Sequence, residues 1–208
     1  MAPLKGTPLA SFTAFCGPRR IASGSLQDVA LSTKDWLDRG GDPVLVFDDR
    51  SGQQLDLDLR GTPAEALERL DQHPWLRTQQ EQDERRAGPG RPKLGVISRE
   101  VSLLPRHWDW LNEQSGGASA TLRKLVEERM KASRGRDRAR KAHEAAAKFG
   151  WIMGGNLPQY EEVARAMARK EYERFDALLV DWPADIRDHL RMLVAKAVQA
   201  DQEADHDE

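Results

Sequence analysis

The first 76 residues alternate short apolar runs with turn residues, a pattern that predicts a small α+β unit. Residues 55–59 alternate strictly between leucine and aspartate, which is typical of a strand with one face in water. In chain order the predicted elements are strands at 11–15 and 20–23, a helix at 26–37 capped by Ser25, strands at 44–47 and 54–59, and a helix with Thr62 as its cap and Pro63 in its first turn. The predicted order is ββαββα.

Apolar periodicity is lost between residues 77 and 96, where the sequence is rich in charged residues, glutamine, glycine and proline. This composition predicts a flexible basic linker. We therefore divide the chain into an α+β domain at 1–76, the linker at 77–96, a compact unit at 97–131, and a helical region with an acidic tail at 132–208.

Beyond residue 104 the apolar spacing is helical. A helix at 106–114 is predicted to bury Trp108 and Leu111, and Gly116-Gly117 separates it from a second helix. The second helix has Leu122, Leu125, Val126 and Met130 along one face. Ser133-Arg134-Gly135 predicts a weak point, after which helices are predicted at 137–153, 158–169, 171–180 and 183–200, followed by a frayed acidic end.

The net charge of −2 hides a strong segregation of charge along the chain. Residues 1–75 carry 8 basic and 11 acidic side chains, and residues 181–208 carry 3 and 8. Residues 123–148 instead carry 10 basic and 4 acidic side chains. A basic middle between acidic flanks is typical of a segment that contacts nucleic acid, or of a solvated, arginine-rich helix face.

A short basic arm precedes the 97–131 unit. Gly90-Arg91-Pro92-Lys93 resembles the Gly-Arg-Pro core of an AT-hook, and Arg85 and Arg86 lie just upstream. Proline keeps such an arm extended, while the cations enter the narrow, electronegative minor groove of A·T-rich DNA. We therefore predict DNA contacts from Arg85, Arg86, Arg91 and Lys93.

Residues 97–131 resemble a ribbon-helix-helix DNA-binding unit. The strand at 99–104, the proline that opens the next helix, and the two amphipathic helices follow that order. The resemblance implies a homodimer in which two copies of the strand pair and enter the major groove. It places Arg99 and Ser102 on the ribbon, and Ser119, Arg123 and Lys124 near phosphates at the start of the second helix, with Ser119 as its cap.

The register of the ribbon strand has two alternatives. If Leu104 faces the core, then Ser102 and Glu100 also turn inward, and Arg99 points to DNA together with two aliphatic residues. If the register shifts by one residue, Val101 and Leu103 turn inward and Ser98, Glu100 and Ser102 face DNA. A bulge would mend either register.

Most of the chain also resembles an uncharacterised bacterial family that carries only a domain-of-unknown-function designation. The resemblance lies in four long motifs, at 13–24 (TAFCGPRRIASG), 44–61, 90–128 and 181–190 (DWPADIRDHL). It implies no activity.

Candidates for other chemistry are few. Asp48 and Asp49 are predicted at a hairpin turn, and the histidines (73, 107, 143, 189 and 206) show no metal-binding spacing. We expect no metal, no cofactor and no enzymatic activity. A single cysteine, Cys16, indicates a reducing compartment, and the sequence shows neither a signal peptide nor a membrane span.

Together these patterns predict a cytoplasmic, homodimeric DNA-binding protein that acts as a transcriptional regulator. Its N-terminal domain would bind a protein or a small ligand. The alternative is a protein-interaction module whose basic segment binds an acidic partner or RNA. A third hypothesis is an enzyme whose site forms only in three dimensions.

Overall fold

The computed structural model describes residues 12–74 and 98–206, and the predicted basic linker at 77–96 lies outside them. The chain is an α+β protein, as predicted. Its N-terminal part contains strands β1 (Phe12–Cys16), β2 (Arg19–Gly24), β3 (Leu45–Asp48) and β4 (Gln53–Leu55), with helices α1 (Leu26–Asp38) and α2 (Pro63–Asp71). Both predicted caps are present: Asp28 donates its backbone N–H to Ser25, and Thr62 forms a reciprocal capping box with Glu65.

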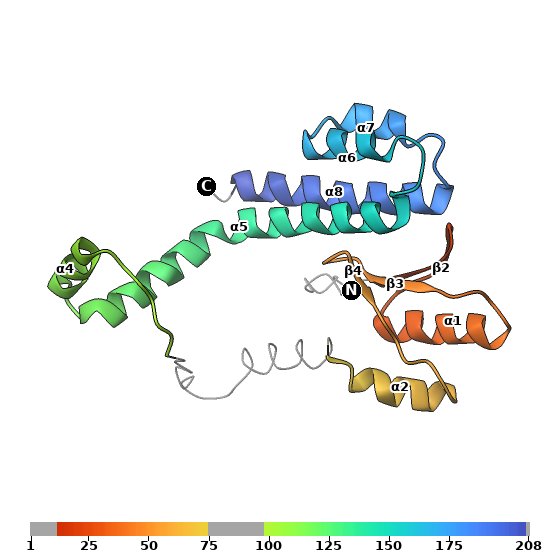
Figure 1. Ribbon diagram of the computed structural model, residues 1–208, viewed down its shortest axis with the longest axis horizontal. Coiled ribbons are helices and arrows are strands. Elements are labelled where there is room, and N and C mark those ends of the chain that lie inside the picture. The colour runs from red at the N-terminus through yellow and green to blue at the C-terminus, as the bar shows by residue number, and fades with distance from the viewer. Residues whose placement is uncertain (1–11, 75–97, 207–208) are drawn as a thin grey trace, which may run out of the picture.

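The four strands form an antiparallel sheet in the order β2-β1-β3-β4, and its central strands β1 and β3 are buried on both faces. Side chains of successive residues point to opposite faces of a strand. Phe12 and Ala14 accordingly join a cluster with α1, whereas Phe15 and Phe47 join a cluster with the C-terminal helices. In Figure 1 the sheet lies between α1 on one side and the C-terminal helices on the other.

The last strand is shorter than predicted. β4 ends at Leu55, although the leucine–aspartate alternation continues and Leu57 and Leu59 still pack on the α1 cluster. In the register that pairs Val46 with Leu55, Asp56 and Leu57 would lie opposite Leu45 and Val44, and Pro43 would end the ladder at Asp58. Proline has no N–H to donate to a ladder.

The C-terminal part is entirely helical. It comprises α4 (Pro105–Glu113), α5 (Gly117–Gly154), α6 (Tyr160–Ala168), α7 (Tyr172–Leu178) and α8 (Ala184–His206). The second half of α5 packs along α8 and the sheet, and α6 and α7 cover the other side of this pair (Figure 1). The first half of α5 extends beyond the rest of the molecule and carries α4 at its end.

Two predictions about the C-terminal helices are wrong. α5 runs without a break through residues 133–135, because Gly135 lies against α8: a Cβ atom there would be 2.9 Å from the Cα of Ala204. The glycine therefore serves close helix packing. The acidic end is also helical as far as His206, and Asp201 within it accepts hydrogen bonds from His143 (2.9 Å) and Lys170 (2.7 Å).

One hydrophobic cluster joins both ends of the chain. Phe15 and Phe47 from the sheet pack with Phe149 of α5 and Leu190 of α8, and all four are at most 1% exposed. The turn between β3 and β4 also touches α5: a Cβ atom at Gly52, whose φ is +66°, would lie 2.3 Å from the carbonyl oxygen of Ala145. The segments on the two sides of residues 77–96 therefore share a core.

Candidate nucleic-acid interface

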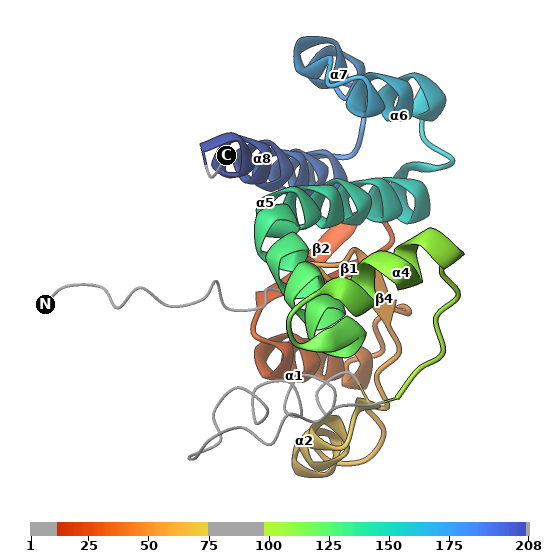
Figure 2. The ribbon, with the colours of Figure 1, turned by 90° about the vertical axis from the view of Figure 1, so that its left-hand side faces the viewer.

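Residues 98–134, which we call the arm, contain the described part of the predicted DNA-binding unit. α4 lies across the first turns of α5, as Figure 2 shows, and Leu111 is buried between them at 3% exposure. Trp108 was predicted to share that burial, but it remains 37% exposed. A nine-residue helix crossing a single partner helix buries only a narrow stripe, so much of its apolar surface faces water.

The segment at 98–104 leads into α4 as extended, mostly exposed chain, and it forms no strand in a single copy. Leu104 has φ −68° and ψ 150°, an extended conformation that passes directly into Pro105. Strand geometry requires a ladder partner, and no described part of the same chain supplies one. The strand predicted at 99–104 is thus not formed in a single chain, and its pairing with a second copy stays a prediction.

The structure places the predicted contact residues as follows. Arg85, Arg86, Arg91 and Lys93 lie outside the described residues. Arg99 and Ser102 are exposed on the extended segment, and Ser119, Arg123 and Lys124 are exposed on α5. Of these, the structure brings into contact Ser119 and Arg123, whose guanidinium donates to the serine hydroxyl at 3.2 Å.

Ser119 does not cap α5. The helix begins at Gly117, two residues earlier than predicted, and its N-cap is Gly116 with φ +104° and no side-chain cap. A glycine at this left-handed backbone position lets the chain turn directly from α4 into α5. Ser119 therefore lies within the first turn, where its hydroxyl contacts a side chain one turn ahead.

The arm exposes an unusual number of large apolar side chains, which together we call the arm surface. Three of them lie on α5, where Leu125 is 43%, Val126 55% and Met130 61% exposed. The full set is Val101, Leu104, Trp108, Trp110, Leu125, Val126 and Met130. A concentration of exposed apolar groups is typical of a surface that binds a partner.

A buried polar cluster lies between the sheet and α8. The hydroxyl of Thr13 donates to Oδ2 of Asp49 at 3.0 Å, and Nε2 of His189 lies 3.2 Å from Oδ1 of the same carboxylate. All three residues are at most 4% exposed. The carboxylate stands between the hydroxyl and the imidazole, whereas a nucleophilic triad needs the imidazole next to the hydroxyl. The cluster therefore links the β3–β4 turn to α8.

Sequence reasoning missed this cluster. Asp48 behaves as the turn residue predicted, accepting from the backbone N–H of Arg50 and the hydroxyl of Ser51, but Asp49 turns inward. The sequence feature that could have indicated this cluster is His189, a polar residue within the apolar stripe of α8 beside Ile186 and Leu190. Its distance along the chain from Asp49 concealed the partnership.

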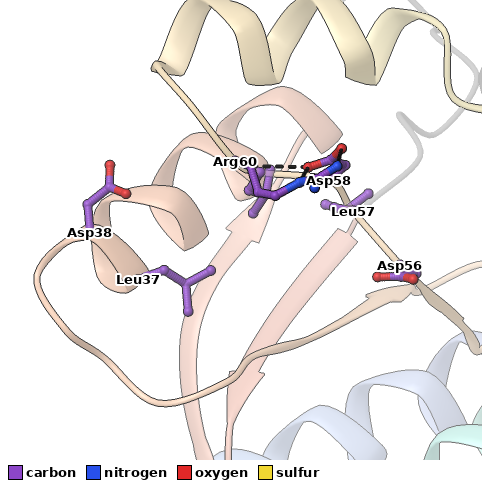
Figure 3. A pocket seen from close by; sticks show the side chains of 7 residues that line it. Leu37, Asp38, Asp56, Leu57, Asp58 and Arg60 are labelled. Carbon is purple, nitrogen blue, oxygen red and sulfur yellow. Dashed lines mark hydrogen bonds and ion pairs between the residues drawn. The ribbon is translucent and has the colours of Figure 1, made fainter.

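A shallow depression of about 640 Å³ lies between the end of α1 and the chain that follows β4 (Figure 3). Asp58 and Arg60 form a bidentate ion pair there, with N–O distances of 2.9 and 2.7 Å. Hydrogen bonds from the side chain and backbone of Arg60 hold the pKa of Asp58 well below its usual range. The carboxylate is thus ionised at neutral pH.

Residues 12–74 and 98–206 contain neither a cluster of metal-binding side chains nor a helix able to span a membrane. No three histidine, cysteine, aspartate or glutamate side chains come together in an arrangement that would hold a metal ion. Of the helices in these ranges, none combines the length and apolar character that crossing a bilayer requires.

The molecule is an α+β protein with a helical arm that carries apolar and basic side chains. Residues 11–194 match the model of the family described as "Uncharacterized protein conserved in bacteria (DUF2239)", and the chain belongs to this family. Neither the curated proteins nor the solved structures include a significant match to it.

Proposed function

We propose that this is a cytoplasmic, non-enzymatic DNA-binding protein that regulates transcription as a homodimer. The observation that carries the proposal is the arm, in which an unpaired extended segment, a proline, two helices and an apolar surface follow one another. We assign the binding of a regulatory protein or small ligand to the N-terminal part, where the depression offers polar groups.

Dimerisation would satisfy two features that a single chain leaves in water. The backbone of residues 98–104 offers N–H and C=O groups to a second copy of itself. The arm surface offers apolar side chains that two arms could bury against each other around a two-fold axis. A ribbon and a helical interface would then form together.

DNA is the favoured ligand because the arm carries exposed cations as well as apolar side chains. Arg123 and Lys124 are exposed on α5, and Arg99 is exposed on the extended segment. The Gly-Arg-Pro arm, with Arg91 and Lys93, precedes them directly in sequence. Phosphate contacts would position the dimer, while the ribbon would contact the major groove and the Gly-Arg-Pro segment at 90–93 the minor groove.

A mobility-shift titration of the full chain on duplex DNA tests the proposal. We expect a shift that weakens steeply between about 50 and 200 mM salt, because each phosphate contact releases a counterion. Arg91→Ala with Lys93→Ala should weaken the shift more on A·T-rich than on G·C-rich duplexes. Absence of a shift at low salt would refute DNA binding, and capture of single-stranded RNA alone would favour the interaction-module alternative.

Sedimentation of matched variants tests the dimer. Val126→Glu with Met130→Glu places two carboxylates on the arm surface and should give a monomer. Trp151→Glu with Val180→Glu is the control, because these side chains are 68% and 65% exposed elsewhere on the molecule. A wild-type monomer at concentrations that shift DNA would sink the dimeric part of the proposal.

A further inference from the structure

We infer that α5 carries a second DNA contact, a basic stripe that runs from the arm toward the body of the molecule. The stripe consists of Arg123, Lys131, Arg134 and Lys141. The inference rests on the proposed function and extends it. Lys131 is the last residue of the segment that resembles a ribbon-helix-helix unit, and Arg134 and Lys141 lie beyond that segment. The ligand of the stripe would be the phosphate backbone of duplex DNA that continues past the ribbon.

Helix geometry places these residues on one side of α5. A residue turns about 100° around the helix axis, so Arg123, Arg134 and Lys141 fall within about 20° of one another. Met130 of the arm surface also falls about 20° from Arg123, so the apolar surface borders the stripe, and Lys131 lies about 80° from Arg123. Eighteen residues at 1.5 Å each make the stripe roughly 27 Å long. All four side chains are exposed.

Three cations of the stripe differ in their surroundings from Lys124, Arg138 and Arg140, although Arg129 and Lys148 of the same helix also form no ion pair in the described ranges. Lys124 lies 3.9 Å from Glu128, Arg138 pairs with Glu203, and Arg140 pairs with Glu144 and Asp137. Lys131, Arg134 and Lys141, by contrast, form no ion pair with any residue in the described ranges.

Three carboxylates lie near this side of the helix: Glu127 and Asp137 fall about 40° to either side of Arg123, and Glu144 falls about 60° away. Arg140 pairs with Asp137 and Glu144. Asp137 is engaged by the hydroxyl of Ser133 at 3.0 Å and by Arg140. Hydrogen bonds from Ser133 and Arg140 lower the pKa of Asp137, so the acid stays ionised and directed to those groups.

A row of cations along one helix fits the regular charge of a duplex better than it fits a folded acidic surface, although α5 bends between the arm and the body (Figure 2). Duplex DNA presents one negative charge per about 1.7 Å of its axis, and about eight base pairs span 27 Å. Like charges three residues apart on a helix, such as Lys131 and Arg134, repel one another in the free protein. A polyanion of uniform charge removes that repulsion along the whole stripe.

Salt dependence of DNA binding tests the stripe with matched variants of the full chain. Arg134→Gln with Lys141→Gln removes two stripe cations. Arg140→Gln with Lys196→Gln removes the same total charge from a paired cation of α5 and an exposed lysine of α8. The probe is a duplex of about 30 base pairs, long enough for half-sites one turn apart together with flanking DNA.

We expect the stripe variant to lower the slope of log K against log salt by about 1.8. The affinity lost between 50 and 200 mM salt would then be about tenfold smaller than for wild type. The control variant should keep the wild-type slope. Equal slopes for the stripe variant and wild type, on a duplex that wild type binds, would overturn the stripe and leave the proposed function standing. No binding by wild type would overturn both, and a stripe-dependent affinity for single-stranded RNA alone would overturn the assignment to DNA.

Discussion

Asp49 and His189 come from opposite ends of the chain and meet in a place that water does not reach. The imidazole also packs against Phe149, with ring centroids 4.5 Å apart, so its position is fixed by apolar neighbours as well as by the carboxylate. Burial of a charge-bearing group is costly unless a partner accompanies it. Each member of the pair therefore makes the other tolerable.

Replacement of His189 by leucine should destabilise the fold strongly. Removing one partner of a buried polar pair costs about 3–5 kcal/mol, because the other partner keeps its desolvation penalty. Denaturant unfolding gives this loss directly. Combining His189→Leu with Asp49→Asn should cost clearly less than the sum of the two single changes, and strict additivity would show that the two side chains are not coupled.

The hydrogen bonds of Asp201 predict a dependence of stability on pH. Burial works against ionisation, but the hydrogen bonds from Lys170 and His143 outweigh it and lower the pKa of this carboxyl group. A lowered pKa in the folded state stabilises the fold above the unfolded value, near 3.9, and the effect disappears as the pH falls through the folded value.

Unfolding of wild type and Asp201→Asn across the acidic range measures this effect. We expect wild type to be the more stable protein at pH 6–7, and the difference to shrink below about pH 4. A difference that stays constant down to pH 2 would contradict the role given to this carboxylate.

Among the elements, the contact between α5 and α8 depends on two glycines in different surroundings. A Cβ atom at Gly135 would overlap the backbone of Ala204, whereas one at Gly150 would meet a side-chain atom of Leu190 at an ordinary 3.6 Å. Both residues are helical, and alanine is a better helix former than glycine by about 1 kcal/mol. Packing should therefore decide between the two sites.

Gly150→Ala should raise the free energy of unfolding by up to about 1 kcal/mol, the intrinsic helix gain. Gly135→Ala should lower it, because α8 has to move away to make room. Thermal or denaturant unfolding of the two variants beside wild type separates these effects. A gain at both positions would mean that α5 and α8 lie less closely together at Ala204.

The elements that sequence predicted well are those whose signals are local. Ser25 and Thr62 mark helix starts through their own hydrogen bonds, and the β1 and β3 segments are apolar enough to be recognised alone. The limit on the β4 ladder and the continuity of α5 depended on Pro43 and Ala204. These partners lie in other elements, so no local pattern in the predicted segment could reveal them.

The candidate site could be predicted only in part from the sequence. The exposed cations at Arg123 and Lys124 followed from the amphipathic spacing of α5, whereas the start of the helix at Gly117 did not. Ser119 looked like a cap because serine commonly caps helices. The backbone conformation of Gly116 determined the outcome instead.

At the scale of the whole molecule, the N-terminal sheet relies on helices that follow it by about 100 residues or more. Phe15 and Phe47 are covered by α5 and α8, so a fragment of residues 1–76 would expose them. We expect this fragment to lose cooperative unfolding and to bind a hydrophobic dye, while the full chain does neither. A fragment with a sharp thermal transition and no dye binding would show that the segment folds by itself.

Because α5 runs without interruption from the arm to the body, an insertion or deletion within it changes the orientation of the arm relative to the body. One residue inserted near position 132 would rotate the arm about the helix axis by about 100° relative to the body and divide the basic stripe between two sides. Insertions of seven or eleven residues would restore its phase to within about 20°. We therefore expect relatives of this chain to gain or lose residues in α5 in steps close to whole helical turns, a periodicity that the lengths of their sequences can reveal.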